Sequence, residues 1–85
     1  MKSFKYTIKD PQGVHARPAG IVVAEAKKYQ SNIKIKFNGK EADAKRIFGV
    51  MGLCIKAENE IEVVVEGADE DAAAKAMQTA LSKNL

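Results

Sequence analysis

The sequence contains no tryptophan, a single cysteine and no apolar run close to the length of a membrane span. A helix that crosses a bilayer needs about 20 mostly apolar residues, so we expect no direct membrane insertion. Cys54 has no partner for an internal disulfide, and the first ten residues alternate apolar and polar side chains, unlike a signal peptide. These features favour a cytoplasmic protein.

Histidine is equally rare, because His15 is the only one. One histidine and one cysteine fall short of the three or four ligands of a typical metal site, so we expect no metal. Three Phe, two Tyr and no Trp offer few surfaces on which nucleic-acid bases could stack, so we expect no nucleic-acid partner. No linker or repeat divides the chain, which predicts a single domain over residues 1–85.

Acidic residues are scarce in the first two thirds of the chain. Residues 1–56 contain 12 Lys and Arg against 4 Asp and Glu, whereas residues 57–85 contain 2 against 7. A basic region of this kind is typical of proteins that recognise a phosphate-bearing ligand or an acidic protein surface. It is also typical of a solvated lysine-rich face, and charge alone leaves both interpretations open.

Alternation of apolar and polar residues predicts strands over residues 3–9, 32–37, 40–43 and 60–67. Asn38-Gly39 predicts a type I′ hairpin turn, because both residues tolerate positive φ. Apolar residues at helical spacing predict a helix with a buried stripe from Ala19 to Tyr29. A final helix follows Asp69, which is a candidate capping residue, and a two-turn helix is predicted within residues 45–55.

The predicted order of elements is β-α-β-β-α-β-α. Helices with one apolar stripe need one face of a sheet to cover, while the polar side chains of the strands suit a face in contact with water. We therefore expect an α+β fold, an open-faced sandwich of a four-stranded antiparallel sheet with three helices on one face.

The stretch GVHARPAG, residues 13–20, places His15 at or beside the N-cap of the first helix. A helix start offers free N–H groups and positive potential, Arg17 adds a guanidinium, and a neutral imidazole can accept a phosphoryl group. A nearby carboxylate would oppose this, and no Asp or Glu lies between Asp10 and Glu25. A surface histidine at a helix cap is the alternative interpretation.

The segment KRIFGVMG, residues 45–52, has more apolar residues than a short helix can bury. We expect Ile47, Phe48 and Met51 to form an exposed apolar patch suited to protein partners. A fully buried helix is the alternative.

GVHARPAG together with NGKEADAKRIFGVMGL, residues 38–53, resembles the histidine-containing phosphocarrier (HPr) family of the phosphoenolpyruvate-dependent sugar phosphotransferase system. The resemblance implies a carrier rather than an enzyme. His15 would take a phosphoryl group on Nδ1 from phospho-enzyme I and pass it to the IIA domains of sugar permeases, with Arg17 steadying the group. The phosphoryl group would come ultimately from phosphoenolpyruvate, with no other cofactor, and we expect a monomer.

The resemblance also assigns a docking surface for the partner proteins. Its apolar part would comprise Gly20, Ile47, Phe48 and Met51, with Lys27 and Lys45 in a basic rim. We also expect Ala16 and, because of its positive charge, Arg46 to take part in docking.

Two positions depart from the family pattern. Arg46 stands where many Gram-positive members have a serine that a kinase phosphorylates, which argues against that form of regulation here. Cys54 stands where the family usually has glycine, which implies mild backbone strain or a different loop. We expect Cys54 to be buried and without a catalytic role beside His15.

Two other functions fit parts of the sequence. A regulatory interaction module on the same fold would use the apolar patch but would not need His15 and Arg17. A small anion- or nucleic-acid-binding module would explain the basic region but not the position of the histidine.

Overall fold

Alternating burial along the strands separates a core face of the sheet from a face in contact with solvent. The computed structural model describes residues 1–85 and contains strands β1 (Lys2–Thr7), β2 (Asn32–Phe37), β3 (Lys40–Asp43) and β4 (Glu60–Glu66). Burial alternates along β2 and β4, as predicted. The predicted strands are confirmed, although the first one ends at Thr7 rather than at Lys9.

The strands are joined in the order β1-β4-β2-β3, and each neighbouring pair is antiparallel. Phe4 and Ile35 both lie opposite Val63 of the central strand β4, so their side chains form one row on the core face. Asn38 and Gly39 have φ of +53° and +78°, as the predicted type I′ turn between β2 and β3 requires.

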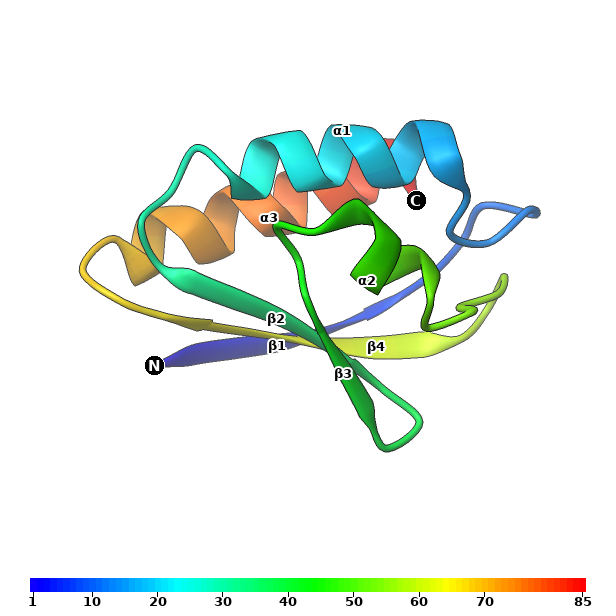
Figure 1. Ribbon diagram of the computed structural model, residues 1–85, viewed down its shortest axis with the longest axis horizontal. Coiled ribbons are helices and arrows are strands. Elements are labelled where there is room, and N and C mark those ends of the chain that lie inside the picture. The colour runs from blue at the N-terminus through cyan, green and yellow to red at the C-terminus, as the bar shows by residue number, and fades with distance from the viewer.

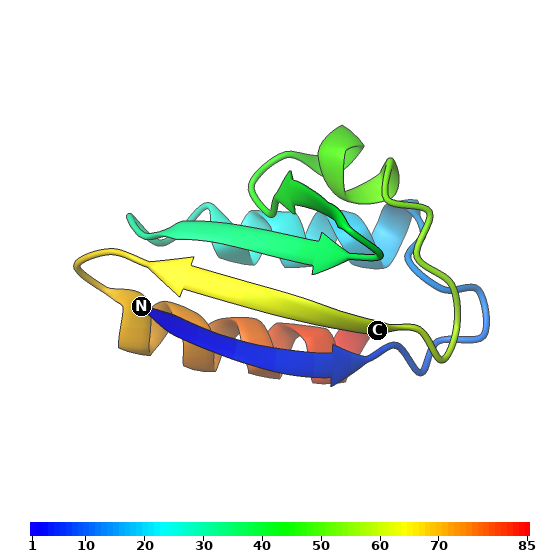
Figure 2. The same ribbon diagram turned by 90° about the horizontal axis from the view of Figure 1, so that it is seen from below.

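Three helices lie on the same side of the sheet: α1 (Ala16–Ala26), α2 (Ile47–Met51) and α3 (Glu70–Asn84) (Figure 1). The opposite face carries no helix (Figure 2). The predicted open-faced α+β sandwich with the order β-α-β-β-α-β-α is therefore confirmed. None of the three helices has both the length and the apolar character that a bilayer crossing requires.

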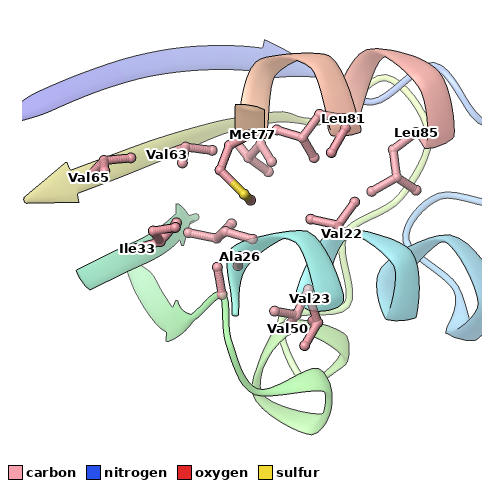
Figure 3. Packing of buried hydrophobic residues seen from close by; sticks show 14 of the residues in the cluster. Val22, Val23, Ala26, Ile33, Val50, Val63, Val65, Met77, Leu81 and Leu85 are labelled. Carbon is pink, nitrogen blue, oxygen red and sulfur yellow. The ribbon is translucent and has the colours of Figure 1, made fainter. Parts of the chain in front are cut away.

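The hydrophobic core lies between the sheet and the two long helices. Val22 and Ala26 of α1 and Met77 and Leu81 of α3 point toward one another and toward the strands (Figure 3). All four are buried, and the predicted stripes on the two long helices are confirmed except at Tyr29 and Ala76, which are half-buried. The predicted first helix extends to Tyr29, whereas α1 ends at Ala26, so Tyr29 lies beyond the helix.

The middle helix is shorter than predicted. α2 has five residues, roughly one and a half turns, rather than two turns. Gly49 lies within it and Gly52 is its C-cap residue, and glycine lowers helix stability by about 1 kcal/mol relative to alanine. Val50 is its one buried residue.

Asp69 occupies the predicted N-cap position of α3, but its side chain does not cap the helix. The carboxylate accepts hydrogen bonds from the N–H groups of Gln30 and Ser31, both at 2.9 Å, and from the Ser31 hydroxyl. These bonds, that of the hydroxyl above all, hold the pKa of Asp69 below its usual value. The predicted cap is wrong because the loop between α1 and β2 offers three donors to this carboxylate.

Candidate functional site

A tight turn between β1 and α1 brings the histidine to the start of the helix. The N–H of Gly13 donates to the Asp10 carbonyl oxygen at 2.9 Å, which closes a turn over the sequence DPQG, residues 10–13. Gly13 has φ of +70°, and a Cβ there would lie 2.6 Å from the Ile55 carbonyl oxygen and 2.7 Å from Lys56 Cα. Only glycine fits where this turn packs against the segment before β4.

His15 is the N-cap residue of α1, as predicted. Its backbone is extended, with φ of −124° and ψ of 172°, and its side chain makes no capping hydrogen bond. The N–H groups of Ala16 and Arg17 have no acceptor within the helix, and they donate none of the hydrogen bonds made outside it. The ring therefore lies beside backbone donors that are free to bind an anion.

Arg17, the second helical residue, is exposed and forms no ion pair with a carboxylate of the chain. A guanidinium without a partner, two residues from the ring, can bind oxygens of an external phosphoryl group through two parallel hydrogen bonds. The helix start has no acidic residue in its first turn that could compete.

A carboxylate nevertheless reaches the histidine ring from the other side of the turn. Asp10 Oδ2 lies 3.3 Å from His15 Nε2, and Asp10 Oδ1 accepts the N–H of Gln12 at 2.8 Å. The Gln12 N–H, followed by the His15 ring, holds the pKa of Asp10 below its usual value. The expectation of a ring without a neighbouring carboxylate is therefore wrong, because the turn folds residue 10 back onto residue 15.

The contact with Asp10 occupies one ring nitrogen only. Nε2 faces the carboxylate, and Nδ1 has no hydrogen-bond partner in the protein. With 36% of its side chain exposed, His15 is accessible to a partner molecule. This arrangement can present Nδ1 as a nucleophile to a phosphoryl donor.

The apolar residues expected in the docking surface lie where α2 meets α1. A Cβ on Gly20 would be 3.7 Å from Ile47 Cδ1, so Ile47 packs against the α1 backbone at this point. Phe48 is 87% exposed, whereas Ile47 and Met51 are half-buried. The expected exposed patch is thus centred on Phe48, with Ala16 exposed at the start of α1.

Lys27 and Lys45, which are expected in the basic rim of the docking surface, both lie at the C-terminal end of α1. Lys27 is the C-cap residue of α1, about 16 Å along the helix from its start. Lys45 is half-buried, and its Nζ donates to the Tyr29 carbonyl oxygen at 2.7 Å, beyond that same end of α1. Arg46 is exposed and lies 3.9 Å from an Asp43 carboxylate oxygen. The ammonium of Lys45 is therefore hydrogen-bonded to the backbone just beyond α1 and does not form part of an open basic rim.

Ile21 and Cys54 are both exposed, although the sequence did not single out Ile21 and predicts that Cys54 is buried. Ile21 is 48% exposed on α1, and its position outside the buried stripe is the signal that could have identified it. Cys54 is exposed rather than buried, and its φ of +55° is left-handed, so of the two expected alternatives the mild backbone strain is the one observed. Its thiol approaches only the Gly52 carbonyl oxygen, at 3.7 Å. No group of three or more His, Cys, Asp or Glu side chains is placed to hold a metal ion.

A family model, a related sequence and a solved structure all indicate the same family of proteins. Residues 2–83 match the family model described as the PTS HPr component phosphorylation site. The phosphocarrier protein HPr of Lysinibacillus sphaericus is 43% identical over 98% of this chain and 94% of its own. A solved histidine-containing phosphocarrier protein of Mycoplasma covers 96% of this chain and 93% of its own, with a TM-score of 0.94 and 38% identity.

These matches define a phosphocarrier of the phosphotransferase system, a protein that carries a phosphoryl group and is not itself a catalytic enzyme. The chain belongs to the HPr family. An HPr dimer from Thermoanaerobacter tengcongensis is also similar, with a TM-score of 0.78 and 36% identity over 98% of this chain and 95% of its own.

Proposed function

We propose that His15 accepts a phosphoryl group on Nδ1 from phospho-enzyme I and passes it to the IIA domains of sugar permeases in the cytoplasm. The observation that carries this proposal is the unpartnered Nδ1 at the start of α1, beside two free N–H groups and an unpaired Arg17. The three features belong to residues 15–17 at the start of α1, and each is suited to an added dianionic group.

The transfer is a nucleophilic substitution at phosphorus. The lone pair of Nδ1 forms the new N–P bond, and the old bond to phosphorus breaks with its electron pair remaining on the donor group of phospho-enzyme I. The N–H groups of Ala16 and Arg17 and the Arg17 guanidinium then stabilise the added negative charge. Transfer to a IIA domain reverses these steps, and the electron pair returns to Nδ1.

The docking surface for both partners would comprise the exposed Ala16, Lys27, Arg46 and Phe48 together with the half-buried Gly20, Ile47 and Met51. A carrier must leave one partner before it meets the next, so its interface should be modest in area and dissociate fast. The exposed cations suit acidic partner surfaces, which would raise the association rate without demanding high affinity. We infer a monomer, since each partner would meet one copy of this surface.

Incubation with phosphoenolpyruvate and enzyme I tests the proposal. The wild-type chain should acquire one acid-labile phosphoryl group that maps to residue 15, and His15→Ala should acquire none while keeping the same fold by circular dichroism. Lys75→Glu, an exposed change on α3, is a control that should be phosphorylated like the wild type. No adduct on the wild type, or an adduct that persists in His15→Ala, would overturn the proposal.

A further inference from the structure

The carboxylate of Asp10 is fixed in place independently of the histidine that it contacts. The N–H of Asp10 donates to the Leu85 carbonyl oxygen at 2.9 Å, and its carbonyl oxygen accepts the N–H of Gly13 at 2.9 Å. Oδ1 accepts the N–H of Gln12 at 2.8 Å. Three bonds thus hold the backbone and one carboxylate oxygen, which leaves Oδ2 to meet the ring of His15 at 3.3 Å.

An ionised carboxylate has no hydrogen to donate. When Oδ2 is hydrogen-bonded to Nε2, that nitrogen therefore carries the hydrogen, and in the neutral ring Nδ1 then holds the free lone pair. The lowered pKa of Asp10 keeps the carboxylate ionised throughout the neutral range.

We propose that Asp10 is a positioning residue, which holds the His15 ring in the tautomer with hydrogen on Nε2 and so makes Nδ1 the phosphoryl acceptor. This inference rests on the proposed function of His15 and adds a second role for the carboxylate. When Nδ1 bonds to phosphorus, the ring becomes an imidazolium that keeps its hydrogen on Nε2. Asp10 faces this positive charge and stabilises it, and the N–P bonding pair returns to Nδ1 when the group leaves.

Asp10→Asn is the sharpest test because it preserves the shape of the side chain. The amide oxygen can still accept the Gln12 N–H, which retains the turn, while the NH₂ group faces Nε2 as a donor. Nε2 must then accept, and the hydrogen moves to Nδ1. If the competent tautomer falls to about a tenth of the population, the rate of phosphoryl acceptance should fall about tenfold.

Two measurements on the full-length chain separate positioning from folding. Nitrogen-15 NMR of the neutral ring identifies the tautomer without any partner protein, and single-turnover transfer from phospho-enzyme I gives the rate. Asp71→Asn removes the same charge at the exposed start of α3, near Lys2 rather than His15, and is the matched control. It should leave both the tautomer and the rate unchanged.

The inference requires both changes in Asp10→Asn, a shift of hydrogen toward Nδ1 and a slower transfer. A tautomer identical to that of the wild type would overturn it even if the rate fell, since Asp10 would then act only on the structure of the turn. An unchanged rate with a shifted tautomer would overturn it as well. Failure of wild-type phosphorylation is a different outcome, because it overturns the proposed function and this inference together, whatever tautomer NMR reports.

Discussion

The two long helices begin in opposite ways. α3 has Asp69 at its N-cap and Glu70 and Asp71 in its first turn, whereas α1 has His15 at its N-cap and no acidic residue in its first turn. A helix start carries a partial positive charge and free N–H groups. α3 therefore meets this charge with carboxylates of its own, and α1 leaves it available for an anion from outside.

The same contrast extends to the two N-cap side chains, neither of which caps its helix. Asp69 binds the buried Ser31 and so joins α3 to the loop after α1. His15 contacts only Asp10 and stays partly exposed. We therefore expect the start of α3 to contribute to stability and the start of α1 to phosphoryl transfer. Substitutions at the two places should separate phosphoryl transfer from folding.

Arg17→Glu would give α1 an acidic first turn like that of α3, and it should have the largest effect. We expect phosphoryl acceptance from phospho-enzyme I to fall about 100-fold or more, because a donor is lost and a negative charge faces the incoming group. The melting temperature should be unchanged or slightly higher, since an acidic residue suits a helix start. Lys75→Glu makes the same change of charge on α3. If Arg17→Glu and Lys75→Glu accepted the phosphoryl group at equal rates, the proposed difference between the two helix starts would be wrong.

Ser31→Ala tests the structural helix start. Ser31 is 1% exposed, and loss of its hydroxyl should lower the free energy of unfolding by about 1–3 kcal/mol, while phosphoryl acceptance stays at the wild-type rate. Denaturant unfolding measures the first quantity and single-turnover transfer the second. A large loss of transfer with little loss of stability would contradict the division between the two helices.

The hydrogen bond between the Ser31 hydroxyl and the Asp69 carboxylate also predicts that the stability of the fold depends on pH. Because the folded pKa of Asp69 lies below the ordinary value of 3.8, its bonds stabilise the fold above that pH. That contribution is lost as the pH falls through the lowered pKa. The free energies of unfolding of the wild type and of Ser31→Ala should therefore become more similar as the pH is lowered to about 2. A difference that stays constant from about pH 7 to about pH 2 would contradict this assignment.

Phe48→Ala tests whether stability and function are also separate at the proposed docking surface. Phe48 is 87% exposed, so its loss should change stability by less than about 0.5 kcal/mol. If it is an anchor for partners, the KM of enzyme I for this chain as phosphoryl acceptor should rise about five- to tenfold. Val50→Ala, at a neighbouring buried position, should do the reverse, lowering stability while leaving KM near the wild-type value.

Arg46→Ser should have the smallest effect. Arg46 is exposed and only loosely paired with Asp43, and the positive charge at this position should speed docking on acidic partners. We expect a two- to threefold lower association rate at low salt, roughly, and a weaker dependence on salt. Unchanged transfer kinetics with an unchanged salt dependence would show that this charge does not contribute to docking.

Much of the fold was predictable because local patterns determine it. Alternation predicted the strands, the Asn38-Gly39 pair predicted the hairpin, and the apolar stripe predicted a helix over most of α1. The stretch GVHARPAG placed His15 at the start of that helix. These features depend on residues a few positions apart. The family resemblance rests on the same local stretches, so it was also visible in the sequence.

Three of the errors concern side chains that bind partners brought close only by the folded chain. Asp69 binds the loop at Ser31, 38 positions away, and Lys45 binds the carbonyl of Tyr29, 16 positions away. Asp10 reaches His15 only because the turn between them closes and packs against another loop. Such contacts follow from the assembled fold, and spacing along the chain carries no signal for them.

The atom to which phosphorus is attached tests the central claim most directly. Nitrogen-15 and phosphorus-31 NMR of the phosphorylated chain should show the phosphorus–nitrogen coupling at Nδ1 of His15, with the hydrogen still on Nε2 facing Asp10. Coupling at Nε2 would contradict the account, because phosphorylation there would require the ring to leave Asp10 and the free donors at the start of α1 would have no part in holding the phosphoryl group.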